Sequence, residues 1–195
     1  LNSARALADS NLASNRAEKA DALVVCGDMS ELGSLDRGIV ILEEIQRGYD
    51  NVFYVTGNHD PPSLMKYDDR STSRLQGKEI SCLHERVVKF GDIALVGLSG
   101  FFPPFYGKWD AEGSPITREG EAERFLDRLL TIAVNELAVD PKRMVVVTHD
   151  PPLGVCDLSV LTRTNAGSQG IRKAVLKWKP AAICCGHIHE GRGIE

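Results

Sequence analysis

The sequence predicts an α/β fold built from parallel strands joined by helices. Residues 23–26 and 52–56 are short apolar runs rich in β-branched residues, and both have the length and composition of buried strands. Between them, residues 35–47 place apolar side chains along one face of a helix. Because a strand, a helix and a second strand in succession usually form a parallel unit, the first half of the chain indicates a parallel sheet.

Periodicity and turn residues place the remaining elements along the chain. Helices are expected where apolar residues recur at helical spacing, over residues 2–20, 35–47, 119–137 and from the cap residue Ser168 onward. Strands are expected at the apolar runs, which cover residues 23–26, 52–56, 80–83, 87–90, 93–98, 144–147 and 181–185. Gly91-Asp92 is expected to be a hairpin turn, and residues 61–78 and 151–167 are expected to be loops.

Aromatic residues gather in the stretch 99–120, which is also rich in glycine and proline; they are Phe101, Phe102, Phe105, Tyr106 and Trp109. One interpretation is a loop whose rings fold onto the core. The other is an aromatic wall beside a ligand site, since binding residues concentrate on loops that a rigid scaffold carries. The sequence leaves both interpretations open.

Composition describes a single globular domain over residues 1–195. Its 43% hydrophobic and 26% charged residues are ordinary for such a domain, and 195 residues suffice for a substantial core. The net charge of -4 gives no basic field for nucleic acid, and no apolar run approaches the roughly 18 residues that span a bilayer. The 5 cysteines lack C-x-x-C spacing, so we expect buried reduced thiols and a reducing, cytoplasmic location.

Four of the apolar runs end in polar residues that can bind a metal ion or move a proton. These residues are Asp28, Asn58-His59-Asp60, His149-Asp150 and His187-Ile188-His189. A tight turn would explain any one of them, because Gly and Asn are common turn residues. Together, however, they hold four of the 5 histidines, and the carboxyl ends of neighbouring parallel strands meet at one rim of a sheet. The sequence therefore predicts a ligand site there, and the remaining histidine, His84, is interpreted as a structural or rim residue.

The side chains at these strand ends suit a divalent metal such as Mn, Fe, Zn or Co. One zinc ion is satisfied by about three or four ligands, whereas the chain offers a larger set: Asp28, Asn58, His149, His187 and His189. An aspartate can bridge two ions, and a pair about 3.5–4 Å apart can activate a water for phosphoryl transfer. His59 is then a candidate general acid for the leaving alkoxide, and Asp60 is expected to orient it.

The order of these motifs resembles the calcineurin-like metallophosphoesterase superfamily. The residues that carry the resemblance are Gly27-Asp28, Gly57-Asn58-His59-Asp60, Thr148-His149 and Gly186-His187-Ile188-His189. The resemblance implies a four-layer α/β/β/α sandwich with a dinuclear metal site between its two sheets. It also implies a division of roles: a bridging Asp28, a first ion completed by Asn58, His149 and His187, a second ion bound by His189, and a catalytic His59.

One motif of that superfamily, an N-terminal D-x-H, is absent from the chain. The early aspartate Asp9 is followed by Ser10-Asn11, which does not match the motif. We therefore expect the chain to be an internal fragment of a longer protein, lacking the superfamily's first strand and C-terminal strands. The first metal site would then be complete, while the second would keep only Asp28 and His189.

The resemblance implies a metal-dependent phosphoesterase. No arginine soon follows Gly27-Asp28, and Asp60 stands where the superfamily's protein phosphatases have glutamate. These differences favour a phosphodiester or small phosphoester substrate. From the composition, no membrane partner is expected and nucleic acid is not indicated. The alternatives are a catalytically weak scaffold or interaction module with the same fold, which the presence of His59 disfavours, and a mononuclear metal binder. The oligomeric state stays open.

Overall fold

The computed structural model describes residues 20–30, 33–67, 79–100, 119–160 and 162–191. Residues 2–19 of the first predicted helix and the aromatic residues at 101–109 lie outside the described residues. What the sequence predicts for them therefore stays a prediction.

The first sheet is parallel. Its strands, in spatial order, are β1 (Leu23–Cys26), β2 (Asn51–Val55) and β3 (Glu79–Cys82). The helix α2 (Leu35–Gly48) connects β1 to β2, so the predicted parallel strand–helix–strand unit is confirmed. This helix begins after Ser34, whose hydroxyl accepts the N–H of Arg37 and so satisfies one of the unpaired donors of the first turn.

The second sheet is mixed. Its strands, in spatial order, are β4 (Arg86–Phe90), β5 (Ile93–Leu98), β6 (Met144–Thr148) and β9 (Ala182–Cys184). Only β4 and β5 are antiparallel, and Phe90 pairs with Ile93 across Gly91-Asp92, which confirms the predicted hairpin turn.

The expectation that all four polar strand ends share the rim of one sheet is wrong. The strands β1 and β2 belong to the first sheet, whereas β6 and β9 belong to the second. The reason is that β3 and β4 follow each other closely in the chain but pair with different neighbours, so the chain changes sheets between them. The arrangement of two sheets is the one that the resemblance implied.

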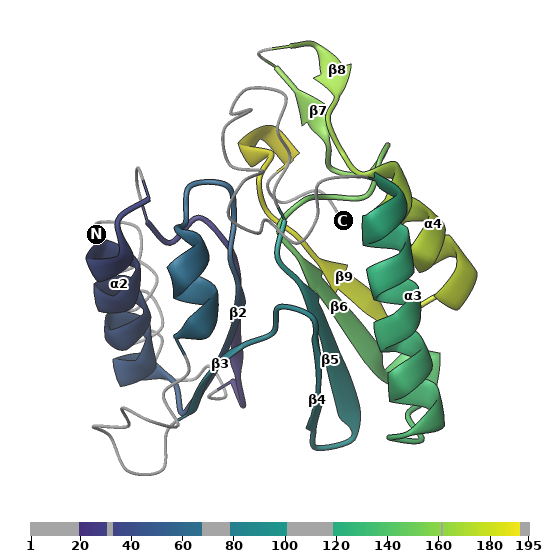
Figure 1. Cartoon of the computed structure of the whole chain (residues 1–195), viewed down its shortest axis with the longest axis horizontal. Helices are drawn as coiled ribbons and strands as arrows, with labels where there is room; N and C mark the ends of the chain where they lie inside the picture. The colour runs from purple at the N-terminus through teal and green to yellow at the C-terminus, as the bar shows by residue number, and fades with distance from the viewer. Residues whose placement is uncertain (1–19, 31–32, 68–78, 101–118, 161, 192–195) are drawn as a thin grey trace.

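Helices cover the outer faces of the two sheets. Figure 1 shows α2 beside the first sheet, and α3 (Glu119–Asn135) and α4 (Gln169–Trp178) beside the second. Ser168 caps α4 as predicted, since its hydroxyl accepts the N–H of Ile171 at 3.1 Å. The α3 helix ends at Asn135, slightly before the predicted boundary at 137.

The segment 151–167, predicted to be a loop, contains a small hairpin of β7 (Leu158–Ser159) and β8 (Thr164–Asn165). Strands of two residues are too short for apolar alternation to reveal them. The polar stretch after β2 likewise begins with a 3₁₀ turn over Pro62–Lys66.

The core follows from the alternation of side chains along the strands. In β2, Val52 and Tyr54 pack toward α2, whereas Phe53 and Val55 pack toward the second sheet. Between the sheets these side chains meet a buried set that comprises Leu83, Leu95 and Val147. A third cluster, which includes Val96, Leu126, Leu130 and Met144, joins the second sheet to α3. The two sheets therefore lie face to face, which brings the ends of β1 and β2 beside the end of β6.

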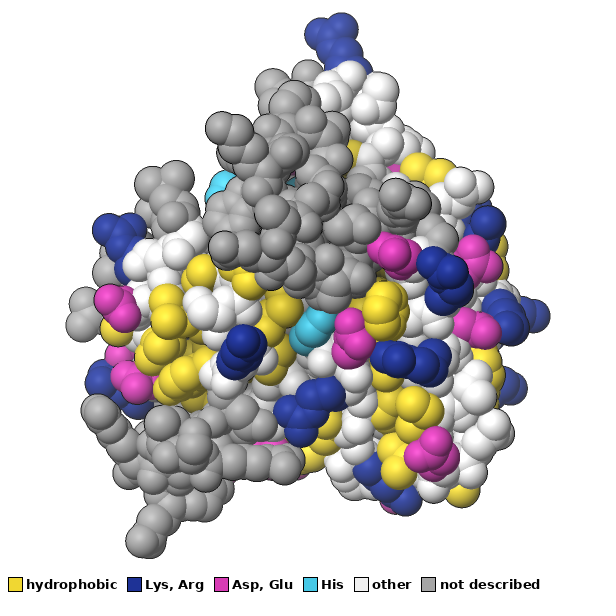
Figure 2. Space-filling view, in the orientation of Figure 1, with side chains coloured by type: hydrophobic (Ala, Val, Ile, Leu, Met, Phe, Trp, Pro, Cys, Tyr) yellow, Lys and Arg dark blue, Asp and Glu magenta, His cyan; other side chains and the backbone are white. Residues whose placement is uncertain are grey.

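The described surface shows mixed charge. On the face in Figure 2, acidic and basic side chains are interspersed rather than separated by sign. None of the described helices is long and apolar enough to cross a bilayer. All five cysteines are thiols.

Candidate metal centre

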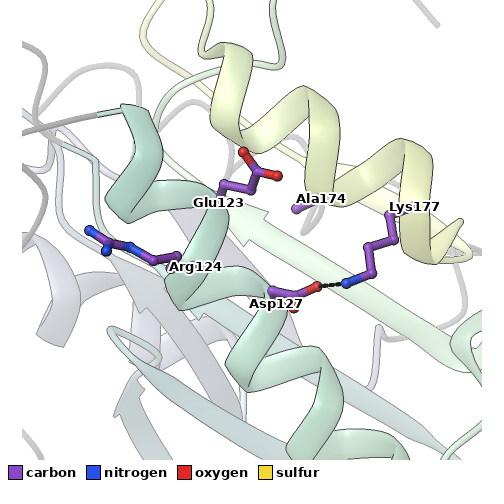
Figure 3. A pocket seen from close by; sticks show the side chains of 5 residues that line it. All are labelled: Glu123, Arg124, Asp127, Ala174 and Lys177. Carbon is purple, nitrogen blue, oxygen red and sulfur yellow. Dashed lines mark hydrogen bonds and ion pairs between the residues drawn. The ribbon is translucent and has the colours of Figure 1, made fainter.

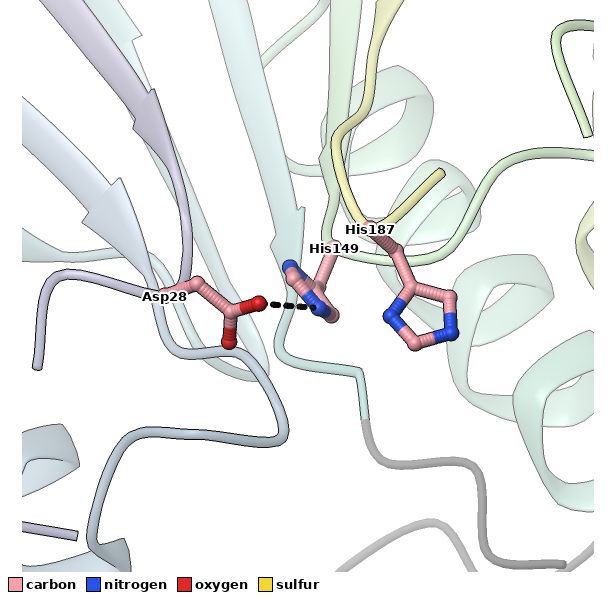
Figure 4. A group of neighbouring side chains, drawn as sticks. All are labelled: Asp28, His149 and His187. Atoms are coloured by element: carbon pink, nitrogen blue, oxygen red, sulfur yellow. Dashed lines mark ion pairs between the residues drawn. The ribbon is translucent and has the colours of Figure 1, made fainter. Parts of the chain in front are cut away.

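The polar side chains that follow four strands point toward one another. Gly27 and Asp28, which follow β1, have positive φ angles of 92° and 58°, and His187, after β9, has a φ of 67°. Such angles are uncommon for residues other than glycine. They bring Asp28 and His187 toward His149, which follows β6 directly (Figure 4).

Four side chains converge at this point. One ligand atom from each of Asp28, His149 and His187 lies within 4.8 Å of the others. Asn58 joins them, because its Oδ1 lies 2.9 Å from Nε2 of His149 and 2.9 Å from Nδ1 of His187. Oδ2 of Asp28 lies 3.5 Å from the same Nε2 of His149. The structure therefore brings together the four residues predicted to bind the first ion.

The protonation of His149 explains what these atoms can hold. Its Nδ1 lies 2.7 Å from the carbonyl oxygen of Cys26, which can only accept, so Nδ1 carries the proton. In the neutral ring Nε2 is then an acceptor, and it faces the acceptor oxygens of Asn58 and Asp28. Ligands about 2.1 Å from a metal lie roughly 3 Å from one another, so this spacing matches a coordination shell. The donor set fits a divalent cation.

Two glycines make this convergence possible. A Cβ on Gly27 would lie 2.5 Å from Nδ1 of His149 and 2.7 Å from the backbone nitrogen of Gly57. A Cβ on Gly57 would lie 2.5 Å from Cε1 of His149 and would overlap the carboxylate of Asp28. Neither position tolerates a side chain while the ligands keep their places.

Burial favours the neutral form of His187, and its neighbour His149 lies deeper still. His149 is only 1% exposed. Burial lowers the pKa of His187 to about 4, and the nearby His149 adds to this effect. Neutral imidazole is the form that binds a metal, so His187 stays ready to bind well below neutral pH.

His59 and His189 lie at the edge of this group and are exposed to solvent. The backbone N–H of His59 donates to Oδ1 of Asp28 at 2.9 Å, so the turn that carries His59 is tied to the centre. His189 belongs to the 3₁₀ turn His189–Gly191 after β9. Both imidazoles are near enough to His187 to lower its pKa further. The structure thus places His59 and His189 beside the four converging side chains and not among them.

Asp60 acts on the backbone and not on the His59 ring. Its carboxylate, 7% exposed, accepts the N–H of Ser30 at 2.7 Å and the N–H of Gly57 at 2.9 Å. Ser30 in turn donates its hydroxyl to the carbonyl of His59 at 3.0 Å. Burial raises the pKa of Asp60, and its two backbone hydrogen bonds offset part of that rise. Asp60 thereby fastens the loop after β1 to the turn after β2.

Sequence reasoning missed two contributors to the centre. Cys26 acts through its backbone carbonyl, which every residue has, so the sequence does not indicate this contact. Ser30 supplies a backbone donor to Asp60 and a hydroxyl to His59, and its closeness to Asp28 in the chain was the only available indication.

A separate depression of about 300 Å³ lies between α3 and α4, lined by Glu123, Arg124, Asp127, Ala174 and Lys177 (Figure 3). Its charges neutralise one another, since Nζ of Lys177 lies 2.6 Å from Oδ1 of Asp127. The hydrogen bond from Lys177 lowers the pKa of Asp127, as does one from Trp178. This depression is an ion-paired surface and not a convergence of possible metal ligands.

Comparison with known proteins agrees with this geometry. The family model of the calcineurin-like phosphoesterases matches residues 3–191. The chain therefore belongs to the calcineurin-like phosphoesterase family, a class of metal-dependent phosphoesterases, and the resemblance carried by the four motifs is confirmed.

Individual proteins are similar to most of the chain. The chain is 28% identical over 184 residues to the uncharacterized protein MJ1162 of Methanocaldococcus jannaschii, with 90% of this chain and 72% of that protein covered. One crystal structure is similar with a TM-score of 0.64 and 18% identity, covering 94% of this chain and 78% of the other. The crystal structure of the protein TT1561 of Thermus thermophilus is similar with a TM-score of 0.58 and 17% identity, covering 92% and 72%. At these identities the solved structures support the fold.

Proposed function

We propose that the protein hydrolyses a phosphodiester or another small phosphoester, using two divalent ions of Mn, Fe, Zn or Co. The observation that carries the proposal is the convergence of possible ligand atoms from Asp28, Asn58, His149 and His187 at separations typical of ligands around one ion. Bound divalent ions supply an activated water and neutralise charge on the phosphoryl group.

Asp28 is the residue that we propose two ions share. Its two oxygens have different partners, because Oδ2 faces His149 while Oδ1 accepts the N–H of His59. Each carboxylate oxygen retains a further lone pair. His189, which is exposed at the edge of the centre, is proposed to bind the second ion only.

His59 is the proposed general acid. Its backbone is fixed on both sides, by its N–H to Asp28 and by its carbonyl, which accepts from Ser30 and from the N–H of Gly33 at 3.0 Å. Its imidazole is exposed beside the ligands, where it can reach a substrate and donate a proton to the leaving oxygen. Asp60 contributes by holding this turn, and is therefore a positioning residue in the proposal.

The preference for a small substrate rests on the motifs. The loop after β1 has no arginine soon after Asp28, and Asp60 replaces the glutamate of the protein phosphatases. We place the protein in the reducing cytoplasm, a location that its five thiols support.

The experiment that tests the proposal is hydrolysis of bis(nitrophenyl) phosphate and nitrophenyl phosphate by protein expressed from the complete reading frame with Mn²⁺. We expect metal-dependent turnover that falls about 10²–10⁴-fold in His59→Ala, the usual contribution of a general acid. Metal binding should persist in that variant, because the His59 side chain is not among the converging ligands. Turnover that is absent, or equal in the two proteins, would favour the scaffold alternative.

A further inference from the structure

His84 lies apart from the metal ligands, in the short connection between β3 and β4. Its side chain is 14% exposed, and its backbone pairs with Gly97 of β5 as an isolated bridge. Gly97 permits this close approach, because a Cβ there would overlap the side chain of Leu83 and lie 2.5 Å from its carbonyl oxygen. The absence of a side chain at Gly97 thus lets the His84 segment lie against β5, with the His84 ring near the end of that strand.

The His84 ring begins a chain of hydrogen bonds that crosses from one sheet to the other. Ser99, just after β5, donates its N–H to Nδ1 of His84 at 3.1 Å. The hydroxyl of Ser99 accepts the N–H of Thr56, just after β2, at 2.9 Å. Gly100 completes the link by donating its N–H to the carbonyl of Thr56 at 3.2 Å. Ser99 and Thr56 are 1% and 0% exposed, so these bonds lie in a dry interior, where each is stronger than in water.

The tautomer of His84 follows from its partner. A backbone N–H can only donate, so Nδ1 of His84 is an acceptor and the ring proton resides on Nε2. Nε2 points toward Oε1 of Glu85 at 3.6 Å, and Glu85 itself accepts from Arg128 of α3 at 3.0 Å. Burial lowers the pKa of His84 despite the nearby Glu85, so the accepting form persists at neutral pH.

The position of this link matters because the metal ligands come from both sheets. Asn58 stands two residues after Thr56 on the first sheet, whereas His149 and His187 follow strands of the second. Oδ1 of Asn58 must stay about 3 Å from both imidazoles, and metal sites tolerate changes of only about 0.2 Å in ligand distance. A bond that fixes Thr56 to the second sheet therefore fixes the geometry of the centre.

We propose that His84 is a positioning residue for the metal centre: by accepting the N–H of Ser99 it holds the Ser99–Thr56 link between the sheets, and thereby the turn that carries Asn58 and His59. The inference rests on the proposed metal site. It gives a role to a histidine that the chemistry of phosphoester hydrolysis does not itself require.

The test compares two substitutions of the same residue. His84→Leu removes the acceptor, whereas His84→Asn places an amide oxygen where Nδ1 stood and keeps it. We expect Co²⁺ affinity, followed by visible absorption, to fall about 10–100-fold in His84→Leu and to be restored to within about threefold in His84→Asn. Ser99→Ala, which removes the acceptor of the Thr56 N–H, should behave like His84→Leu and replaces that variant if it does not fold.

A second measurement, on metal-free protein, separates the two proposals. Hydrogen exchange of the Thr56 amide should accelerate in His84→Leu and return toward the wild-type rate in His84→Asn. Unchanged exchange in His84→Leu, or equal losses of affinity in the Leu and Asn variants, would overturn the role of His84. If the variants show this exchange pattern but the wild-type protein binds no Co²⁺, the proposed function would instead be overturned and the role of His84 in the link would stand.

Discussion

Replacing Gly57 by alanine should weaken metal binding severely, because the new methyl group enters the space between two ligands. It would lie 2.5 Å from Cε1 of His149 and would overlap the carboxylate of Asp28. Carbon atoms pack at about 3.5–4.0 Å, so one of the two ligands must move by about 1 Å. His149 is fixed by its hydrogen bond to the carbonyl of Cys26, which leaves Asp28 and the turn to shift.

The size of the effect follows from that displacement. A movement of about 1 Å is several times the roughly 0.2 Å that a metal site tolerates. We therefore expect an affinity loss of at least about 100-fold, equivalent to about 2.8 kcal/mol. Overpacking of this kind also lowers the free energy of unfolding by about 1–3 kcal/mol.

The assay is titration with Co²⁺ by calorimetry, with urea unfolding measured in parallel. Gly48→Ala is the matched control, because a Cβ on Gly48, the last residue of α2, meets no heavy atom within 4 Å. That variant should bind Co²⁺ like the wild type. If Gly57→Ala also bound with wild-type affinity, the close approach of Asp28 and His149 would not be what the metal requires, and the reasoning would fail.

Two further predictions concern residues around the ligands. Asp60→Ala should lower the free energy of unfolding, measured in urea, by about 2–6 kcal/mol, because the buried N–H groups of Ser30 and Gly57 each lose an acceptor at about 1–3 kcal/mol. A loss below about 1 kcal/mol would contradict the role of Asp60 in holding the turn. His84 has a folded-state pKa lowered from 6.5, so the unfolded chain binds its proton first and stability falls as pH drops below about 6.5. The pH dependence of unfolding should therefore be shallower below about pH 6.5 in His84→Asn than in the wild type, and identical slopes would show that His84 does not contribute.

Much of the fold could be predicted from local sequence patterns. The continuous apolar run at residues 52–56 predicted a buried strand, and β2 is buried on both faces, since Val52 and Tyr54 pack on one side and Phe53 and Val55 on the other. The turn at Gly91-Asp92 and the cap at Ser168 were also predictable, because both depend on residues close together in the chain. The four converging residues stood out as candidate ligands because each follows an apolar run.

Features that depend on distant pairing could not be predicted in the same way. The chain changes sheets between β3 and β4 because the two strands pair with different neighbours, and the local sequence does not indicate which strands those neighbours are. Asp60 was expected to orient the His59 ring, yet its partners are backbone amides, which every residue except proline possesses. The role of His84 likewise depends on the amide of Ser99, brought to it by the pairing of β4 and β5.

Diffraction from crystals grown with Mn²⁺ or Co²⁺, measured at the absorption edge of the metal, tests the central claim most directly. The account predicts an anomalous peak about 2.0–2.3 Å from Oδ1 of Asn58, Nε2 of His149, Nδ1 of His187 and the carboxylate of Asp28. A second peak between Asp28 and His189 would support the dinuclear form of the proposal. The absence of any peak among the four converging side chains at saturating metal, or a peak bound only elsewhere, would contradict the account.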